Sequence, residues 1–242
     1  MKLLVLLVFL VGSISVDART AELRPLTMGL PFHVNRVKAI QQYQDFLTGT
    51  LAQAGFKVTV QTSQGRLISQ MLVDGELDAI MYDDKSWTEG RNKTVSVSFP
   101  IIRTRARVFY LSDHKKFSEE KLKKFKGGFS TNNIVLNKEA SRRKLKYINT
   151  SSPLQSVVDL LGGKIDYFVA IQEVGLSVVD SHPEAKGRVV MGKTVFHEVP
   201  VYLTFARKFE PDLSRIEEAF RKALTGDLSK YPLIMENLNK EP

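Results

Sequence analysis

The chain has 242 residues and carries 35 Lys and Arg against 26 Asp and Glu, for a formal net charge of +9. It contains no cysteine, which excludes disulfides, a thiol nucleophile, thiolate metal sites and a lipidated N-terminal cysteine. The length allows one large or two small domains, and 43% apolar residues can build a proper core. The basic balance indicates an anionic partner without deciding among nucleic acid, a membrane and a small acid.

The N-terminus has the pattern of a secretory signal. Lys2 precedes nine apolar residues at 3–11, and small residues follow at 13–18. Nine residues are too few to cross a bilayer, which needs about 20. We therefore expect residues 1–18 to be a cleaved signal peptide, with a buried N-terminal strand as the alternative. Export without cysteine indicates a bacterial periplasm and argues against a nucleic-acid partner, and no later stretch is apolar enough to span a membrane.

Strands and helices alternate along the first half of the chain. Apolar residues at 37–54 recur with helical spacing, and Gly55 follows where a left-handed cap ends a helix. Short links join the elements, which favours a mainly parallel sheet with helices on both faces. The expected elements are strand 26–30, helix 37–54, strand 56–60, helix 66–73 and strand 77–82.

The second half repeats this scheme. Residues 72–78 and 160–166 match one another, because each has a helix end, a glycine turn and an Asp that enters a strand. Such turns are common in α/β proteins, but the match also predicts two lobes of one architecture facing each other across a cleft. The expected elements are a short strand at Phe129, helix 134–144, strand 146–149, helix 153–161, strand 165–170, strand 199–205 and helix 213–224.

Positive charge is concentrated in residues 113–146, which hold 11 Lys and Arg against four acids and so account for +7 of the net charge. One interpretation is a solvated helical face on one lobe. The other is a functional surface that steers an anionic ligand or contacts an anionic membrane or partner.

Common catalytic motifs are absent from the sequence. It has no HExxH, GxGxxG, GxxxxGK[ST] or GxSxG pattern. Asp83 and Asp84 follow a strand, where they serve either a metal or a base or form an ordinary exposed turn. The four histidines are scattered without metal-ligand spacing, at His33, His114, His182 and His197. We therefore expect that the protein is not an enzyme and that it binds no cofactor and no metal.

A family resemblance lies in residues 88–100. They resemble the T-x-E-R-x-x-x-V-x-F-S-x-P-Y signature of extracytoplasmic solute-binding proteins of the amino-acid type, family 3, with matches at Arg91, Val95, Ser98 and Pro100. Segment 72–78 resembles that family's L-x-x-G-x-x-D element. Segment 202–213 resembles its return strand and C-terminal helix, so the motifs in their order cover nearly the whole mature chain.

The resemblance implies the two-lobed, type 2 periplasmic-binding fold, an α/β architecture whose lobes are joined by two crossover strands near 101–108 and 195–202. It implies a monomer that captures a small carboxylate or amino-acid-like ligand between the lobes for an ABC permease in the inner membrane. The expected division is a signal peptide at 1–18, lobe 1 at 22–104 plus 200–242, and lobe 2 at 105–199.

Arg91 is the strongest candidate for ligand binding, against the alternative of a surface arginine. A guanidinium grips a carboxylate with two parallel hydrogen bonds, and the resemblance gives the arginine of this motif that role. Ser86 matches the position of a hydroxyl that helps to hold the same carboxylate. Phe32 and Trp87 either wall the cleft or belong to the core, and Asp83 is also placed at the cleft.

Lobe 2 is expected to supply Ser130, Thr131 and Asn132, which precede a helix and form either an anion cradle or a simple cap. The family places an ammonium-binding Asp where this chain has Ile171, and Gln172 or Glu173 is the candidate substitute. This departure favours another small carboxylate, or a degenerate cleft in a sensory or interaction module. A periplasmic lyase of the dehydratase type, with Glu173 or Asp83 as acid or base, is a further alternative.

Overall fold

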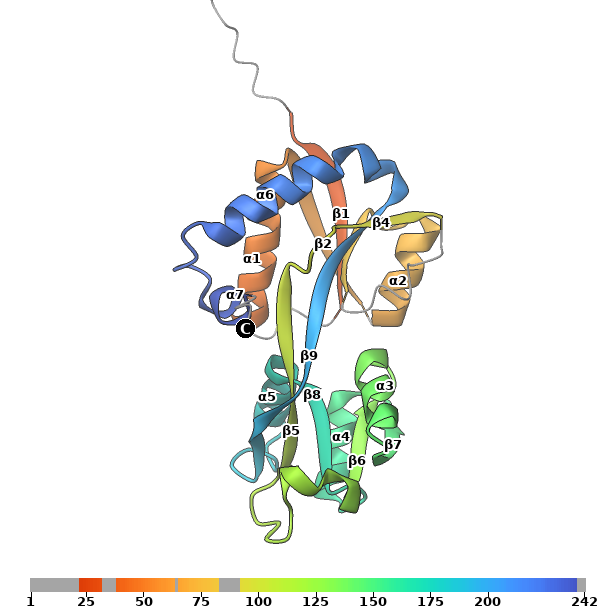
Figure 1. Cartoon of the computed structure of the whole chain (residues 1–242), viewed down its shortest axis with the longest axis vertical. Helices are drawn as coiled ribbons and strands as arrows, with labels where there is room; N and C mark the ends of the chain where they lie inside the picture. The colour runs from red at the N-terminus through yellow and green to blue at the C-terminus, as the bar shows by residue number, and fades with distance from the viewer. Residues whose placement is uncertain (1–21, 32–37, 64, 83–91, 239–242) are drawn as a thin grey trace, which may run out of the picture.

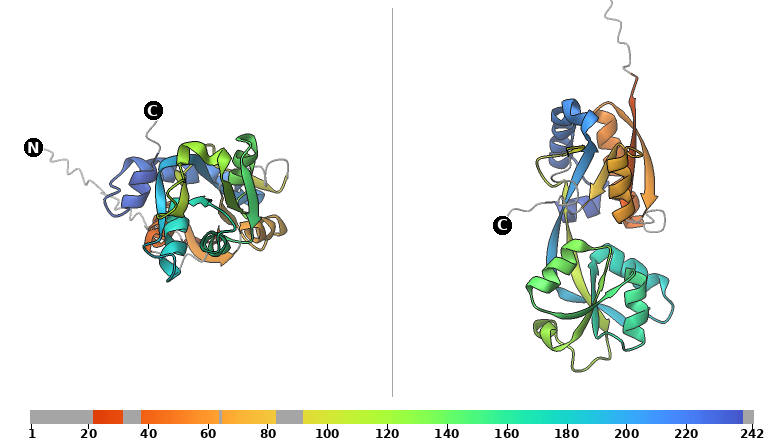
Figure 2. Two further views of the ribbon diagram at one scale, coloured as in Figure 1. Left: turned by 90° about the horizontal axis from the view of Figure 1, so that it is seen from below. Right: turned by 90° about the vertical axis from the view of Figure 1, so that its right-hand side faces the viewer.

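Two α/β lobes lie end to end and are joined by two long strands (Figure 1). The computed structural model describes residues 22–31, 38–63, 65–82 and 92–238. The right-hand view in Figure 2 shows the same division, with a narrow connection between the lobes. The strands that make the connection are β5 (Ile102–Leu111) and β9 (Val189–Ala206), which are antiparallel partners from Ile102 opposite Val201 to Leu111 opposite Val189.

The first lobe is built on a sheet in the order β2-β1-β3-β9, with β4 paired to β9. β1, β2 and β3 are parallel, whereas β9 and β4 are antiparallel to their partners. Gly55 has a φ of 85°, which confirms the predicted left-handed end of α1. The elements are β1 (Arg24–Pro31), α1 (Lys38–Gln53), β2 (Phe56–Ser63), α2 (Gly65–Asp74), β3 (Ala79–Tyr82) and β4 (Thr94–Ser96).

The second lobe has the sheet order β9-β5-β8-β6-β7, in which β8, β6 and β7 are parallel. β5 is antiparallel to β8, so lobe 2, like lobe 1, has three parallel strands followed by antiparallel ones. The elements are η3 (Glu119–Lys124), β6 (Lys126–Ser130), α3 (Ile134–Arg142), β7 (Lys146–Thr150), α4 (Pro153–Leu161), β8 (Tyr167–Ile171) and α5 (Gln172–Ser181).

The chain returns to lobe 1 after β9 and ends there. η4 (Arg207–Asp212), α6 (Leu213–Thr225) and α7 (Pro232–Asn237) follow, and α1, α6 and α7 share one apolar core with the sheet. A smaller cluster around Ile68 and Leu72 of α2 covers the opposite face. Each lobe therefore has its own core, as the alternating pattern predicts.

Two predictions about elements were incomplete. The predicted strand at 199–205 is only the last part of β9, which runs for 18 residues because its two halves pair in different lobes. The segment 172–181 was not assigned, and the structure places α5 there. α5 packs on the sheet through Val179 and the close approach of Gly175 to Phe109, a tertiary contact that its short and weakly periodic sequence does not reveal.

Candidate functional site

The carboxyl ends of the parallel strands in the two lobes point toward each other (Figure 1). In lobe 1 they belong to β1 and β3, which end at Pro31 and Tyr82. In lobe 2 they belong to β6 and β8, which end at Ser130 and Ile171. Open α/β sheets bind ligands at the carboxyl ends of their strands, so these two edges define the candidate site.

The lobe 1 part of the predicted site lies outside the described residues. This applies to every candidate in that lobe: Phe32, Asp83, Ser86, Trp87 and Arg91. The chain leaves the described part at Pro31 and at Tyr82, the ends of two strands that are parallel neighbours. These five residues therefore stay predictions.

The lobe 2 candidates lie on two adjacent strand ends. β6 and β8 are parallel with Phe129 opposite Val169, so Ser130 and the residues after Ile171 reach the same edge of the sheet. Ser130 is 7% exposed, and its carbonyl accepts hydrogen bonds from Asn133 N and Asn137 Nδ2. The structure thus brings Ser130, Thr131 and Asn132 close in the sheet to Gln172 and Glu173, which open α5.

The helix that follows Ser130 has an ordinary cap. Asn133 is the N-cap of α3, and its Oδ1 accepts a hydrogen bond from Leu136 N at 3.0 Å. The amide of Asn132 donates to Ser130 Oγ at 3.4 Å, and the amide of Thr131 donates to Thr150 O. These bonds favour the capping interpretation for much of the segment, while the exposed Thr131 and the half-buried Asn132 remain at the edge.

Gln172 is held by a cation that the sequence reasoning missed. Arg107 Nε donates to Gln172 Oε1 at 3.1 Å, and the same guanidinium also donates to the carbonyl of Lys193 on β9. Arg107 therefore links the start of α5 to both long strands. The available sequence signal was the alternation of Arg103, Arg105 and Arg107, which places three cations on one face of a strand.

Ile171 and Glu173 flank this contact and differ in character. Ile171 is half-buried and packs against the apolar cluster around Phe129 and Tyr167. Glu173 lies in the first turn of α5, where the helix dipole favours a negative charge. The lobe 2 edge is thus apolar at Ile171, polar at Ser130 and Gln172, and acidic at Glu173.

One ion-pair cluster anchors the C-terminal end of α3 to β9. Glu139 is 7% exposed and accepts hydrogen bonds from Arg142 and Arg143 at 2.6–2.7 Å. The bond from Arg142 is the main cause that lowers the pKa of Glu139 to about 2, although burial opposes it. Arg143 in turn donates to Phe196 O and lies 4.3 Å over the Phe196 ring.

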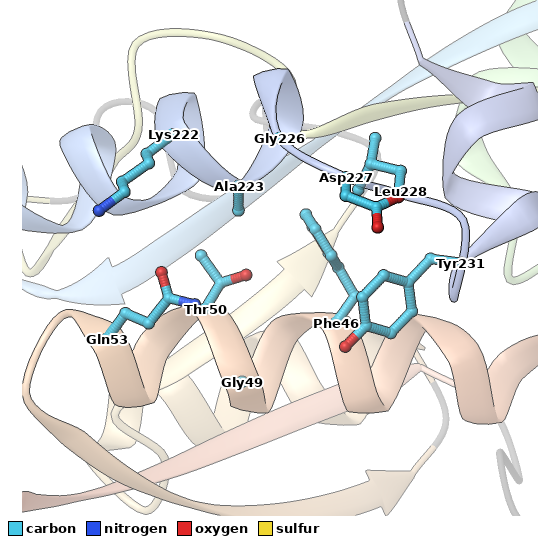
Figure 3. Close-up of a pocket in the computed structure, with 10 residues that line it drawn as sticks. All are labelled: Phe46, Gly49, Thr50, Gln53, Lys222, Ala223, Gly226, Asp227, Leu228 and Tyr231. Carbon is cyan, nitrogen blue, oxygen red and sulfur yellow. The ribbon is translucent and has the colours of Figure 1, made fainter.

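A separate pocket of about 290 Å³ lies within lobe 1 (Figure 3). Phe46 and Thr50 of α1 line it together with Lys222 of α6, and Asp227 and Tyr231 close it from the segment before α7. It contains none of the predicted site residues and is not formed between the lobes. The pocket is therefore distinct from the candidate site.

The described residues contain neither a metal-binding cluster nor a membrane-spanning helix. No group of three or more His, Cys, Asp or Glu in that part of the chain is arranged to hold a metal ion. Within the same ranges, no helix is long and apolar enough to cross a membrane.

Known structures share this two-lobed arrangement. The chain is similar to the VFT2 domain of BvgS from Bordetella pertussis (13% identity, 88% of this chain and 92% of that one, TM-score 0.67). It is also similar to a histidine kinase sensor domain with similarity to periplasmic binding proteins (17% identity, 89% of this chain and 96% of that one, TM-score 0.66). A third similar structure is the substrate binding protein of an amino acid ABC transporter (11% identity, 88% of this chain and 96% of that one, TM-score 0.63).

The likeness at this level of identity establishes the fold. The chain has the two-lobed periplasmic-binding-protein fold, as the sequence predicts, and its neighbours of known structure are mainly binding proteins and sensor domains. No family model and no curated protein sequence matches the chain.

Proposed function

We propose that this chain is a periplasmic solute-binding protein that captures a small carboxylate or amino-acid-like ligand between its lobes and presents it to an ABC permease. The observation that carries the proposal is the opposition of two strand-end edges across the β5–β9 connection. Two strands that join separate cores provide a hinge, because bending them changes the angle between the lobes without disturbing either core.

The chemistry at the two edges supports a carboxylate-bearing ligand. Arg91, which lies outside the described residues, has the planar donor fork that grips a carboxylate, and its motif resembles that of amino-acid-binding proteins. On the lobe 2 side, Thr131 and Asn132 offer a hydroxyl and an amide, and Gln172 is held in place by Arg107. Ile171 offers no negative charge to an ammonium group, which favours a carboxylate that lacks an amino group over a standard L-amino acid.

Export rests on the N-terminal pattern, and delivery to a permease rests on the resemblance to solute-binding proteins. Residues 1–18 have the charged start, short apolar run and small-residue end of a secretory signal, and they lie outside the described residues. A periplasmic location fits the fold, since the similar structures include a substrate binding protein of an ABC transporter.

A sensory module is the second candidate function. The histidine kinase sensor domain covers 89% of this chain at a TM-score of 0.66, so the same fold serves signalling in other proteins. Ile171 stands where the family has its ammonium-binding Asp. This supports the alternative, because a cleft that has lost its ligand no longer needs the carboxylate of that Asp. In that case the lobes would act through a partner protein and no small molecule would be delivered.

A thermal-unfolding screen tests the proposal. The standard L-amino acids and matched carboxylates without an amino group, such as glutarate beside glutamate, are added at saturating concentration. A ligand at 100 times its Kd stabilises by about 2.7 kcal/mol. That corresponds to a rise in Tm of about 5–10 °C for a chain of this size.

The matched variants are Arg91→Ala at the site and Arg188→Ala, an exposed arginine at the opposite end of lobe 2. The proposal predicts that Arg91→Ala abolishes the shift and Arg188→Ala preserves it. A screen in which no carboxylate raises Tm would favour the sensory module. A shift that survives in Arg91→Ala would place the ligand elsewhere.

A further inference from the structure

Eight exposed lysines lie in residues 115–126 and 144–146, and these segments run at the end of lobe 2 that faces away from lobe 1 (Figure 1). β5 ends there, and β6 and β7 begin there because they run antiparallel to it within the sheet. Lys126 and Lys146 open these two strands and are direct register partners. We call this group the distal basic surface; its members are Lys115, Lys116, Lys121, Lys123, Lys124, Lys126, Lys144 and Lys146.

The charge of the distal basic surface is largely uncompensated. None of the eight lysines makes an ion pair with a carboxylate of the described chain. Two nearby carboxylates are engaged by backbone amides. Glu119 accepts from Lys193 N and Thr194 N, and Asp166 accepts from Lys126 N at 2.7 Å. Asp113 and Glu120 lie in the same chain segment as Glu119.

An aromatic cluster holds the lysine-bearing segment in place. The Phe117 ring stacks on Tyr110 at 4.4 Å and lies 5.1 Å from Phe125 and 5.8 Å from Tyr167. His114 packs edge-on against both phenylalanines. Residues 112–125 are therefore pinned to the core of lobe 2, and the lysines between these rings are exposed on its outer side.

We infer that the distal basic surface docks on an anionic phospholipid membrane. Most cations at this end are lysine ammonium groups, which act as hydrated point charges rather than as forks for one specific anion, and the exposed Arg188 adjoins them, its carbonyl accepting from Ser112 N. They are spread over three chain segments at one end of an elongated molecule, as contact with a flat surface requires. Half-buried rings of Phe117 and Phe125 lie among them, and Phe is one of the apolar residues that membrane-surface segments bury at the headgroup boundary.

This orientation leaves the candidate site free. The strand-end edges of β6 and β8 lie at the opposite end of lobe 2 from the distal basic surface. Lobe 1 would then point away from the membrane and could move about β5 and β9 while lobe 2 stays attached. The inference goes beyond ligand capture and does not depend on which ligand is bound.

Co-sedimentation with vesicles tests the inference, using the mature chain and phosphatidylcholine vesicles with or without about 30 mol% phosphatidylglycerol. We expect binding to the anionic vesicles alone, at about 50 mM salt, and its loss at about 500 mM, because salt screens exposed charges. Each basic residue near an anionic surface contributes about fivefold in affinity. The triple variant Lys121→Gln, Lys123→Gln, Lys124→Gln should therefore bind about 100-fold more weakly.

The control removes three exposed lysines of lobe 1, as Lys57→Gln, Lys222→Gln and Lys230→Gln, and so changes the net charge equally. It should bind within about twofold of the unmodified chain, and thermal unfolding checks that both variants are folded. Equal loss in both triples, or no binding to anionic vesicles, would overturn the inference. Binding to soluble polyglutamate but not to vesicles would also overturn it and assign the surface to an acidic protein.

Discussion

Asp78 in lobe 1 and Asp166 in lobe 2 make the same pair of bonds to a neighbouring parallel strand. The Asp78 carboxylate accepts from Thr27 N at 2.8 Å while its amide donates to Thr27 O, and Asp166 does the same with Lys126 at 2.7 and 2.8 Å. Each follows a glycine with positive φ, 83° at Gly75 and 68° at Gly163. The repeated turn in the sequence thus marks the same structural position in both lobes.

Replacing either aspartate by alanine should destabilise its own lobe. Each substitution leaves a strand amide without its carboxylate partner, which costs about 1.5–3 kcal/mol for a charged acceptor. Urea unfolding of Asp78→Ala and Asp166→Ala measures both losses. Asp74→Ala is the control, since within the described residues that carboxylate bonds to Gln70 alone, on the exposed side of α2, and it should cost under about 0.5 kcal/mol. Equal stability of all three variants would contradict the equivalence.

Two glycines in helices predict opposite results for the same substitution. A Cβ at Gly175 of α5 would lie 2.2 Å from the Phe109 ring, which stacks on Phe168 at 4.9 Å. Gly175→Ala should therefore destabilise by about 1–3 kcal/mol. A Cβ at Gly49 of α1 meets nothing within 4 Å, so Gly49→Ala should stabilise by about 0.5–1 kcal/mol through helix propensity. Denaturant unfolding separates the two, and the same sign for both would be inconsistent with this packing.

Glu139 makes the stability of lobe 2 depend on pH. Its pKa is about 2 in the folded chain, against an ordinary value of 4.5, mainly because Arg142 donates to the carboxylate. The stabilisation is fully present above pH 4.5 and is lost as the pH falls toward 2. Because Arg142 is 72% exposed and screened by solvent, we expect about 1–2 kcal/mol.

Glu139→Gln tests this dependence through unfolding free energies at pH 7 and near pH 2. The variant should be less stable at pH 7 and indistinguishable from the unmodified chain near pH 2. Glu184→Gln makes the same carboxylate-to-amide change at an exposed position and serves as the control. A difference between Glu139→Gln and the unmodified chain that stays constant with pH would show that the ion pair is not responsible.

The bond between Arg107 and Gln172 can be measured by a double-mutant cycle. Arg107→Met keeps most of the side-chain length, and Gln172→Ala removes the acceptor. We expect a coupling free energy of about 1 kcal/mol in urea unfolding, because the donor is charged but half-exposed. Coupling below about 0.3 kcal/mol would mean that the bond does not hold the start of α5.

The sequence was most informative where a local signal and tertiary packing agree. Helix 153–161 was predicted to the residue, because Ser152 caps it and Pro153 opens it, and both roles are present in the structure. Gly55 likewise marked the end of α1. In contrast, the N-cap of α5 is Ile171, which makes no side-chain capping bond, so the start of this helix has no local signature.

The long strands were underestimated because their environment changes along their length. β9 pairs with β5 in lobe 2 and with β3 and β4 in lobe 1, so its buried face does not follow a single alternation. For the site, the family resemblance supplied Arg91 and Gln172, and the polar residues before a predicted helix supplied Ser130. Arg107 escaped notice because its role arises from contacts with residues 65 and 86 positions away.

Ligand-induced closure tests the central claim most directly. Small-angle X-ray scattering of the mature chain, with and without the carboxylate that raises Tm most, measures the distance between the lobes. The account predicts a smaller radius of gyration with ligand, and no change in Arg91→Ala at the same concentration. An unchanged radius of gyration at full saturation, or equal compaction in Arg91→Ala, would contradict a ligand held between the lobes by that arginine.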